Sequence, residues 1–358
     1  MRDFLINRFF WVFLGFYAQV TVADLFPVCS KGRWGYIDNH GVLKIEYKYD
    51  FAQTFSEGCA FVRKDERAFF ISENDEVLFE LQDEPTFCYA EPFSCGLSLV
   101  NKKPGGEEFY IDRQGRRLRL PVGAKSLSSF ACGLASVKID GKYGYIDQSG
   151  SLVISNKYDF AVPFVDGVAR VWERKVFFCI DKEGVTIRNQ KYEKVIASYL
   201  PTGISIVLLS QASEETGNEP QTIGRQYSEK KKVQNCIVVD HEGNQVGDSQ
   251  FKQVGLFKEG KVFVCSNKKW GFVDATGRIC IGLKYDMVLS ISPKSDGIIA
   301  VQIGDKWGYI DDRGKIFIEP QFYEVENFQN GLAKVTNAGD DWGYIDKTGK
   351  YVWRNVNR

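Results

Sequence analysis

The feature that most constrains this chain is a short motif that returns along its whole length. Residues Trp34 to Asp38 read Trp-Gly-Tyr-Ile-Asp, and a glycine follows the aspartate three residues later. Strong copies start at three further tryptophans: Trp270, Trp307 and Trp342. Weaker copies keep the Asp and the Gly three residues apart, at Asp112, Asp147, Asp181 and Asp240, and the most degenerate copy has Ser72 and Asp75 at those places. The copies lie about 35 residues apart, a period that predicts a repeat protein of about nine units.

A second signature, Phe-x-x-Gly, recurs at the same period and is often followed by x-Ala-x-Val. It occurs at six places: Phe55, Phe93, Phe130, Phe164, Phe257 and Phe328. Between the two signatures stands an aromatic residue with an acid after it, as in Tyr49-Asp50, Tyr158-Asp159, Tyr192-Glu193, Tyr285-Asp286 and Tyr323-Glu324. Each unit therefore carries three landmarks.

The landmarks predict strands and tight turns. Alternating segments of four to six residues, such as Leu332 to Val335, are too short and too aromatic for helices. Asp-x-x-Gly between two such segments is typical of a hairpin, because the Asp side chain closes the turn and Gly accepts a positive φ. We expect an all-β fold of tandem three-stranded antiparallel repeats, each stable only against its neighbours.

The motif resembles a known family. Lys306 to Gly314 reads Lys-Trp-Gly-Tyr-Ile-Asp-x-x-Gly, and Phe328 to Val335 reads Phe-x-x-Gly-Leu-Ala-x-Val; both are similar to the signature of WG-repeat (KWG) proteins. The resemblance covers roughly Pro27 to Trp353 and implies a β-repeat architecture and a binding role, not an activity. A propeller-like toroid is preferred over an open curved β-array, because closure leaves no exposed sheet edges.

The N-terminus is typical of a signal peptide. Arg2 and Arg8 precede an apolar stretch that is too short for a membrane span, and Thr21 and Ala23 fit a cleavage site before Asp24. We expect a signal peptide over 1–23 and a repeat domain over 24–358, in a protein that is exported to the periplasm, the medium or the cell surface. No stable membrane span is expected after cleavage.

A polar insert near 210–233 accounts for the one long step between repeats. It lacks hydrophobic periodicity and ends in three lysines, Lys230 to Lys232. We expect a surface loop, with a partner-binding segment that orders on contact as the alternative. Basic and acidic residues balance at 46 each, so no net charge favours nucleic acid as a partner.

The residues that usually carry catalysis are scarce. The two histidines, His40 and His241, both fall inside Asp-x-x-Gly turns, where we expect solvated turn residues. One Asp per unit is too few for a calcium site, so hairpin capping is the preferred role of these acids. The acids that follow Tyr are expected to cap the backbone, with a ring of carboxylates for a cationic ligand as the alternative. No catalytic, cofactor-binding or metal-binding residue is predicted, and no cofactor.

The tryptophans and cysteines are also expected to be structural. In the Trp-Gly pair we expect the indole to fill the space between neighbouring sheets and the glycine to permit a close approach of the backbones. The alternative is that the indoles form a sugar-stacking surface. Cys59, Cys179 and Cys236 replace core residues of other units, whereas Cys95 and Cys132 replace polar ones. We expect those two to be exposed, separate thiols.

These observations favour a non-catalytic, exported binding or protein-interaction scaffold. The expected partner is a protein or a cell-envelope polymer. The alternative is an enzyme, or an accessory domain of a hydrolase, that acts on cell-envelope polymer through a central funnel.

Overall fold

A computed structural model shows an all-β protein. It describes residues 24–81, 89–101, 106–174, 176–187, 195–199, 204–208, 236–240, 242–247, 250–255, 260–289, 297–338 and 341–355. The expected signal peptide over 1–23, the insert and His241 lie outside the described residues. Within those ranges the chain forms nine antiparallel sheets, which we call blades 1 to 9. The same ranges hold no helix long and apolar enough to cross a membrane.

The strands follow one another in chain order. Blade 1 is β1 (Phe26–Ser30), β2 (Arg33–Ile37) and β3 (Leu43–Tyr49); blade 2 is β4 (Phe51–Ala52), β5 (Cys59–Lys64), β6 (Arg67–Ser72) and β7 (Val77–Glu80); blade 3 is β8 (Tyr89–Ala90), β9 (Leu97–Asn101) and β10 (Glu108–Asp112). Blade 4 is β11 (Leu134–Ile139), β12 (Lys142–Asp147) and β13 (Leu152–Tyr158); blade 5 is β14 (Phe160–Ala161), β15 (Ala169–Glu173) and β16 (Val176–Ile180); blade 6 is β17 (Val195–Tyr199), β18 (Ile204–Leu208) and β19 (Cys236–Val239).

The last three blades have four strands each. Blade 7 is β20 (Gln253–Val254), β21 (Lys261–Ser266), β22 (Lys269–Asp274) and β23 (Ile279–Tyr285); blade 8 is β24 (Met287–Val288), β25 (Ile299–Ile303), β26 (Lys306–Ile310) and β27 (Ile316–Phe322); blade 9 is β28 (Glu324–Val325), β29 (Ala333–Thr336), β30 (Trp342–Ile345) and β31 (Tyr351–Asn355).

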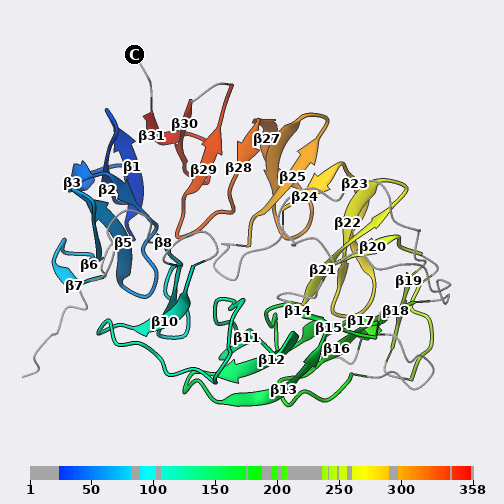
Figure 1. Ribbon diagram of the computed structural model, residues 1–358. Helices are drawn as coiled ribbons and strands as arrows, with labels where there is room; N and C mark the ends of the chain where they lie inside the picture. Colours follow the sequence, from blue (N-terminus) through cyan, green and yellow to red (C-terminus); the bar gives the residue numbers. More distant parts are fainter. Residues whose placement is uncertain are drawn as a thin grey trace, which may run out of the picture.

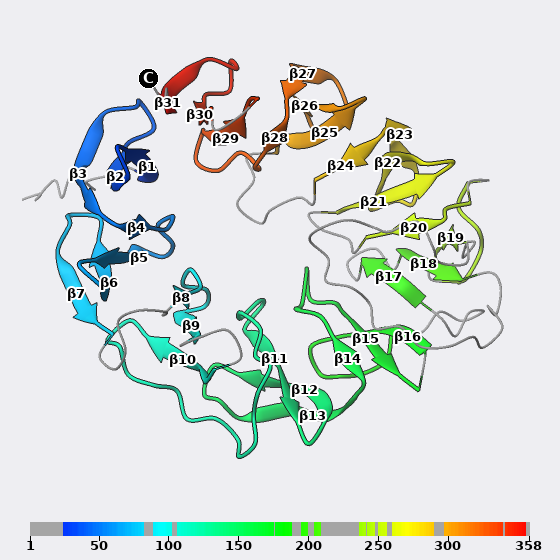
Figure 2. The ribbon, with the colours of Figure 1, turned by 45° about the horizontal axis from the view of Figure 1, so that its top comes forward.

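The blades stand side by side in a ring (Figures 1 and 2). Figure 2 shows short strands such as β4, β14 and β28 toward the middle and long ones such as β3, β13 and β27 at the outside. The first and last blades meet, because the Tyr344 hydroxyl donates to the Pro27 carbonyl at 3.2 Å and the indoles of Trp34 and Trp342 stack with centroids 6.1 Å apart. The structure therefore confirms the propeller-like arrangement.

The hydrophobic core is divided among the contacts between blades. Nine clusters of buried side chains each span two neighbouring blades. In one of them Tyr36 and Ile45 of blade 1 meet Ala52 and Val62 of blade 2. Burial of these side chains stabilises the ring by about 25 cal/mol for each Å² of apolar surface removed from water. Each blade thus depends on its neighbours for a core, as a repeat protein should.

The described blades differ from the expected three strands in one respect. Four of them have a fourth strand of only two residues, β4, β20, β24 and β28, on the inner edge of the sheet. In blade 2 the amides of Asp50 and Gln53 donate to the carbonyls of Arg63 and Phe61 on β5. The sequence does not predict this strand, because two residues are too few for an alternating pattern.

The glycine of the Trp-Gly pair does permit a close approach, as expected. A Cβ atom on Gly308 would lie 2.5 Å from the carbonyl oxygen of Ile318 on the outermost strand. Strand pairing is irregular at the same point, between Trp307 and Tyr309. The glycine therefore lets the outer strand cross close over the middle strand.

We predict that Gly308→Ala lowers the free energy of unfolding by about 1–3 kcal/mol, because the backbone must shift to relieve the clash. Gly282→Ala is the matched control, since a Cβ atom on this exposed strand glycine meets nothing within 4 Å and its φ is not positive. Urea denaturation of both variants measures the difference. Equal effects of the two substitutions would contradict the close-approach role.

Candidate functional site

The recurring turn acids are occupied by their own hairpins. The Asp38 carboxylate accepts hydrogen bonds from the amides of His40 and Val42, both at 2.9 Å. Partial burial raises the pKa of Asp38, but those amide bonds and Lys44 outweigh it and hold the pKa below its ordinary value. His40 is exposed in the turn. In six other blades a backbone amide of the turn donates to the turn aspartate in the same way; these aspartates are Asp112, Asp147, Asp181, Asp274, Asp311 and Asp346. The predicted capping role is confirmed.

The acids that follow Tyr join neighbouring blades. Asp286 in blade 8 accepts a hydrogen bond from the Gly304 amide of its own blade at 2.9 Å and forms an ion pair of 2.6 Å with Lys269 of blade 7. Asp159 is held in the same way by the Arg174 amide and Lys142. In both pairs the lysine is the main cause that lowers the pKa of the aspartate. These carboxylates therefore act as links between blades and are not free for a cationic ligand.

The last copy of this landmark departs from the pattern. Tyr323, not Glu324, stands at the position of Asp50 and Asp286, because its amide donates to the carbonyl of Thr336 as the Asp286 amide donates to Gln302. Lys306 lies over the Tyr323 ring, 2.9 Å from its centroid. A cation–π contact thus replaces the ion pair at this junction. A basic residue precedes the Trp or Tyr in four units, at Arg33, Lys142, Lys269 and Lys306. It is the signal that could have revealed these links, and sequence reasoning did not assign it this role.

The buried tyrosine of the Trp-Gly-Tyr motif forms a second link. The Tyr36 hydroxyl donates to the Gln53 carbonyl of blade 2 at 2.7 Å, and the Tyr309 hydroxyl donates to the Glu326 carbonyl of blade 9 at 2.8 Å. Equivalent bonds run from two other tyrosines, Tyr110 to Ser128 and Tyr145 to Val162. Each acceptor lies on the short stretch of chain at the inner edge of the next blade, which we call its inner segment. Each of these hydroxyls therefore links its own blade to the inner segment of the next one. The constant spacing of 17 or 18 residues was visible in the sequence, but the pairing was not.

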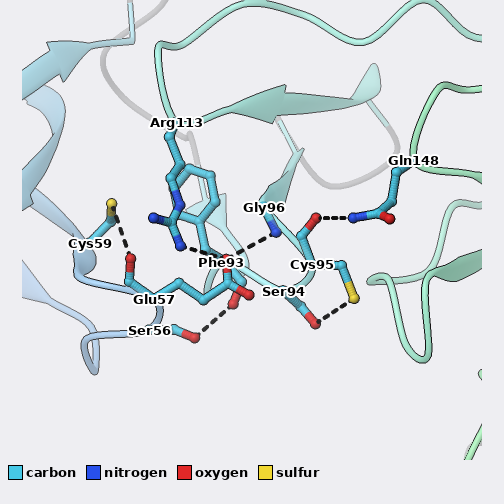
Figure 3. Close-up of polar contacts among 9 residues, drawn as sticks. All are labelled: Ser56, Glu57, Cys59, Phe93, Ser94, Cys95, Gly96, Arg113 and Gln148. Atoms are coloured by element: carbon cyan, nitrogen blue, oxygen red, sulfur yellow. Dashed lines mark hydrogen bonds and ion pairs between the residues drawn. The ribbon is translucent and has the colours of Figure 1, made fainter.

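A third set of links lies at the Phe-x-x-Gly turns. The Ser56 hydroxyl donates to the Phe93 carbonyl of blade 3 at 2.6 Å, and the Ser94 hydroxyl donates to the Phe130 carbonyl of blade 4 at 2.8 Å. Figure 3 shows the first of these bonds together with Glu57, whose carboxylate accepts hydrogen bonds from the Gly96 amide and from Arg113. The turn side chains of blades 2 to 4 are thus engaged with one another.

A pocket of about 410 Å³ lies at the inner face of the ring, where blade 9 meets blade 1. Its lining comes from blades 9, 1, 2 and 3: Pro27, Trp34, Phe51, Ala52, Gln53, Thr54, Tyr89, Pro92, Glu326, Lys334 and Tyr344. Four of these eleven residues are aromatic: Trp34, Phe51, Tyr89 and Tyr344. The one acid and the one base that line it are 3.7 Å apart, from Lys334 Nζ to Glu326 Oε1. The lining thus mixes aromatic side chains with one ion pair and the polar residues Gln53 and Thr54.

The tryptophans pack between blades, but incompletely. Trp270 and Trp307 lie half-buried against the clusters of their blade junctions, whereas Phe272 and Tyr309, two residues further on, are fully buried. Trp34 packs against Phe51 and also lines the pocket. The aromatic residue two positions after the Trp is therefore part of the core between the blades, and the indole packs on the edge of that core.

The cysteines are free thiols wherever the structure describes them. Cys59, Cys179 and Cys236 are buried, as predicted. Cys132 is exposed, but Cys95 is half-buried, so the expectation of exposure is wrong for Cys95. The reason is that Cys95 packs on the cluster between blades 3 and 4. The described residues hold no group of three or more His, Cys, Asp or Glu placed to bind a metal ion.

Comparison with known families assigns the repeat. The family described as "WG containing repeat" matches residues 34–67, 125–143, 143–171, 238–270, 270–307 and 307–339, which together span half of the chain. The chain belongs to the WG-repeat family. The resemblance noted in the motifs is thereby confirmed, and three of the matched segments begin at a Trp-Gly pair, at Trp34, Trp270 and Trp307. No curated protein matches the chain.

Solved structures resemble the WG-repeat chain in fold alone. A eukaryotic initiation factor aligns over 93% of this chain and 96% of its own at 10% identity, with a TM-score of 0.57. The dihydro-heme d1 dehydrogenase NirN aligns over 93% and 73% at 10% identity, with a TM-score of 0.40. BamB from Moraxella catarrhalis aligns over 77% and 92% at 10% identity, with a TM-score of 0.34. Only the first of these similarities bears on the fold, and it supports a propeller-like architecture.

We predict that Asp286→Asn destabilises the protein by about 0.5–1 kcal/mol at pH 7, because the carboxylate loses its charge toward Lys269 but keeps an acceptor for the Gly304 amide. The pKa of Asp286 is lowered in the folded state, so its contribution is present above the unfolded value of about 4 and is lost as the pH falls through the folded value. The difference from the wild type should therefore shrink toward pH 3. Denaturation at both pH values measures it, with exposed Asp305→Asn as the control. A loss that is equal at both pH values would contradict the ion-pair role.

Proposed function

We propose that this WG-repeat protein is a non-catalytic, exported binding scaffold, and that its ligand binds in the pocket where blade 9 meets blade 1. The pocket is the observation that carries the proposal. It combines the aromatic faces of Trp34, Phe51 and Tyr89 with a single Lys334–Glu326 pair. Aromatic faces offer a large contact area at little conformational cost, so the site suits an apolar or ring-bearing group.

The ligand class follows from the same lining. Tyr89 is 43% exposed and Trp34 is half-buried, so both present a face to an incoming group. A protein segment or a cell-envelope polymer offers such groups. Export is supported by the charged, apolar and small-residue pattern of residues 1–23. Export and a cell-envelope ligand are consistent with each other, because an exported protein encounters the cell envelope.

The carboxyl groups favour binding over chemistry. Hydrolases of glycosidic bonds use two facing carboxyl groups. One carboxylate, Glu326, lines the pocket. Burial raises the pKa of Glu91, which lies next in sequence to a lining residue, but Glu91 does not itself line the pocket. The hydrolase alternative therefore gains no support from this site.

A capture experiment tests the proposal. We expect immobilised protein to retain a specific component of an envelope extract, and Tyr89→Ala to reduce that retention at least about tenfold, the effect of losing about 1.4 kcal/mol of binding energy. Phe317→Ala is the matched control, because Phe317 is 45% exposed on the outermost strand of blade 8, away from the pocket. Retention that depends on Phe317 as much as on Tyr89 would place the binding surface elsewhere and refute the pocket as the site.

A further inference from the structure

The pocket at the junction of blades 9 and 1 holds an acid and a base that both belong to blade 9. The amide of Glu326 donates to the carbonyl of Lys334 at 2.8 Å, so the two side chains leave neighbouring points of the sheet. Lys334 Nζ lies 4.7 Å from the centroid of the Trp342 ring, a contact that holds the ammonium group beside the aromatic residues of the junction. The Lys334 and Glu326 side chains are 33% and 66% exposed. Both charged groups are therefore within reach of a ligand.

The acid and the base are too far apart to satisfy each other. Lys334 Nζ and Glu326 Oε1 are 3.7 Å apart, whereas a hydrogen bond of this kind spans about 2.7–3.2 Å. A hydroxyl oxygen about 2.8 Å from each atom accepts from the ammonium group and donates to the carboxylate, because a hydroxyl is both an acceptor and a donor. Two neighbouring hydroxyls divide the same two roles between them. The pair is thus matched to a ligand that carries hydroxyl groups.

An aromatic side chain forms the other part of the site. Tyr89 is 43% exposed, so part of its ring is accessible to a ligand. Its segment is held in place, because the Glu91 amide donates to the Leu99 carbonyl of β9 at 2.7 Å. Figure 2 shows β8, which carries Tyr89, on the inner side of the ring, as are β4 and β28. The carbon-bound hydrogens on the face of a pyranose ring stack favourably on the negative face of such an aromatic ring.

A sugar fits both parts of the site better than a protein segment does. A pyranose offers an apolar ring face and, at its edge, hydroxyl groups held side by side on neighbouring carbons. A peptide backbone carries its donor and its acceptor on different atoms, and its hydroxyl side chains come one at a time. Gln53 and Thr54 line the same pocket and add further donors and acceptors for hydroxyl groups. The pattern of donors and acceptors therefore favours a sugar.

We propose that the pocket binds a pyranose unit of a cell-envelope polysaccharide, and that two neighbouring free hydroxyls of this unit bridge Lys334 and Glu326. One hydroxyl accepts a hydrogen bond from the ammonium group of Lys334, and its neighbour donates one to the carboxylate of Glu326. The face of the sugar ring stacks on Tyr89. This inference rests on the binding function proposed above and names the ligand class of the same site.

Periodate treatment tests the proposal, because periodate cleaves the carbon–carbon bond between two neighbouring free hydroxyls. An envelope extract is dialysed to remove free sugars and is divided into untreated, periodate-treated and protease-treated portions. Each reagent is quenched and removed before the portion meets the immobilised full-length protein. We expect equal retention from the untreated and protease-treated portions, and at least about tenfold less from the periodate-treated portion.

The other results contradict the proposal in different ways. Retention that survives periodate would overturn it, because the bound group then has no pair of neighbouring free hydroxyls. Retention that protease abolishes would show that the ligand is a protein segment, and the sugar assignment would be wrong while the binding function stands. If the untreated portion is not retained at all, the binding function itself fails and this inference fails with it. The two failures are thus distinguishable.

A pair of variants locates the hydroxyl contact. Glu326→Ala should lower retention of the untreated portion at least about tenfold, the effect of losing a hydrogen bond to a charged group. Glu319→Ala removes an exposed carboxylate from β27 of blade 8 and should leave retention unchanged. Neither variant should change the melting temperature, because both carboxylates are exposed. Equal retention by the two variants would show that the ligand does not contact Glu326, and would overturn the proposal.

Discussion

The fold depends on the hydrogen bond from a buried tyrosine of one blade to the inner segment of the next. The hydroxyls of Tyr36, Tyr110, Tyr145 and Tyr309 all make it, at junctions that are otherwise apolar. Burial raises the pKa of Tyr309 well above its ordinary range, so the hydroxyl stays a donor. An unpaired hydroxyl at such a depth costs about 1–3 kcal/mol. At these four junctions the bond therefore fixes the position of one blade against the next, while the side chains around it supply the burial.

Two surface links repeat around this central bond. Lys269 and Asp286 join blades at the hairpins, and Ser56 joins them at the Phe-x-x-Gly turns. Ion pairs at the surface contribute about 0–1 kcal/mol each, so they orient the blades more than they stabilise them. The consequence for function is that most of the recurring polar side chains are hydrogen-bonded or ion-paired within or between blades, where they serve the fold. At the junction of blades 9 and 1 the Tyr344 hydroxyl donates to the Pro27 carbonyl, and the pocket lies there.

The sequence predicted the regular parts of this molecule because they recur in register. The Asp-x-x-Gly turn of Asp38 and the close approach at Gly308 follow from local chemistry that repeats in blade after blade. The two-residue inner strands were not predictable from periodicity, and neither was the substitution of Tyr323 for an acid. Cys95 was misjudged because its burial depends on the neighbouring blade. The pocket could not be predicted either, since it arises from contacts between the two ends of the chain.

The central claim is that blade 9 packs on blade 1 and completes the ring. Trp34 and Trp342 stack across this junction, although Tyr344 and Pro27 beside them are 317 residues apart in the chain. A double-mutant cycle on Trp34→Ala and Trp342→Ala, measured by urea denaturation, tests it most directly. The account predicts a coupling energy of about 0.5–1.5 kcal/mol for this pair. It also predicts that a cycle on Trp34 and Trp307 is additive within about 0.5 kcal/mol. Additive effects of Trp34→Ala and Trp342→Ala would contradict the ring and favour an open array.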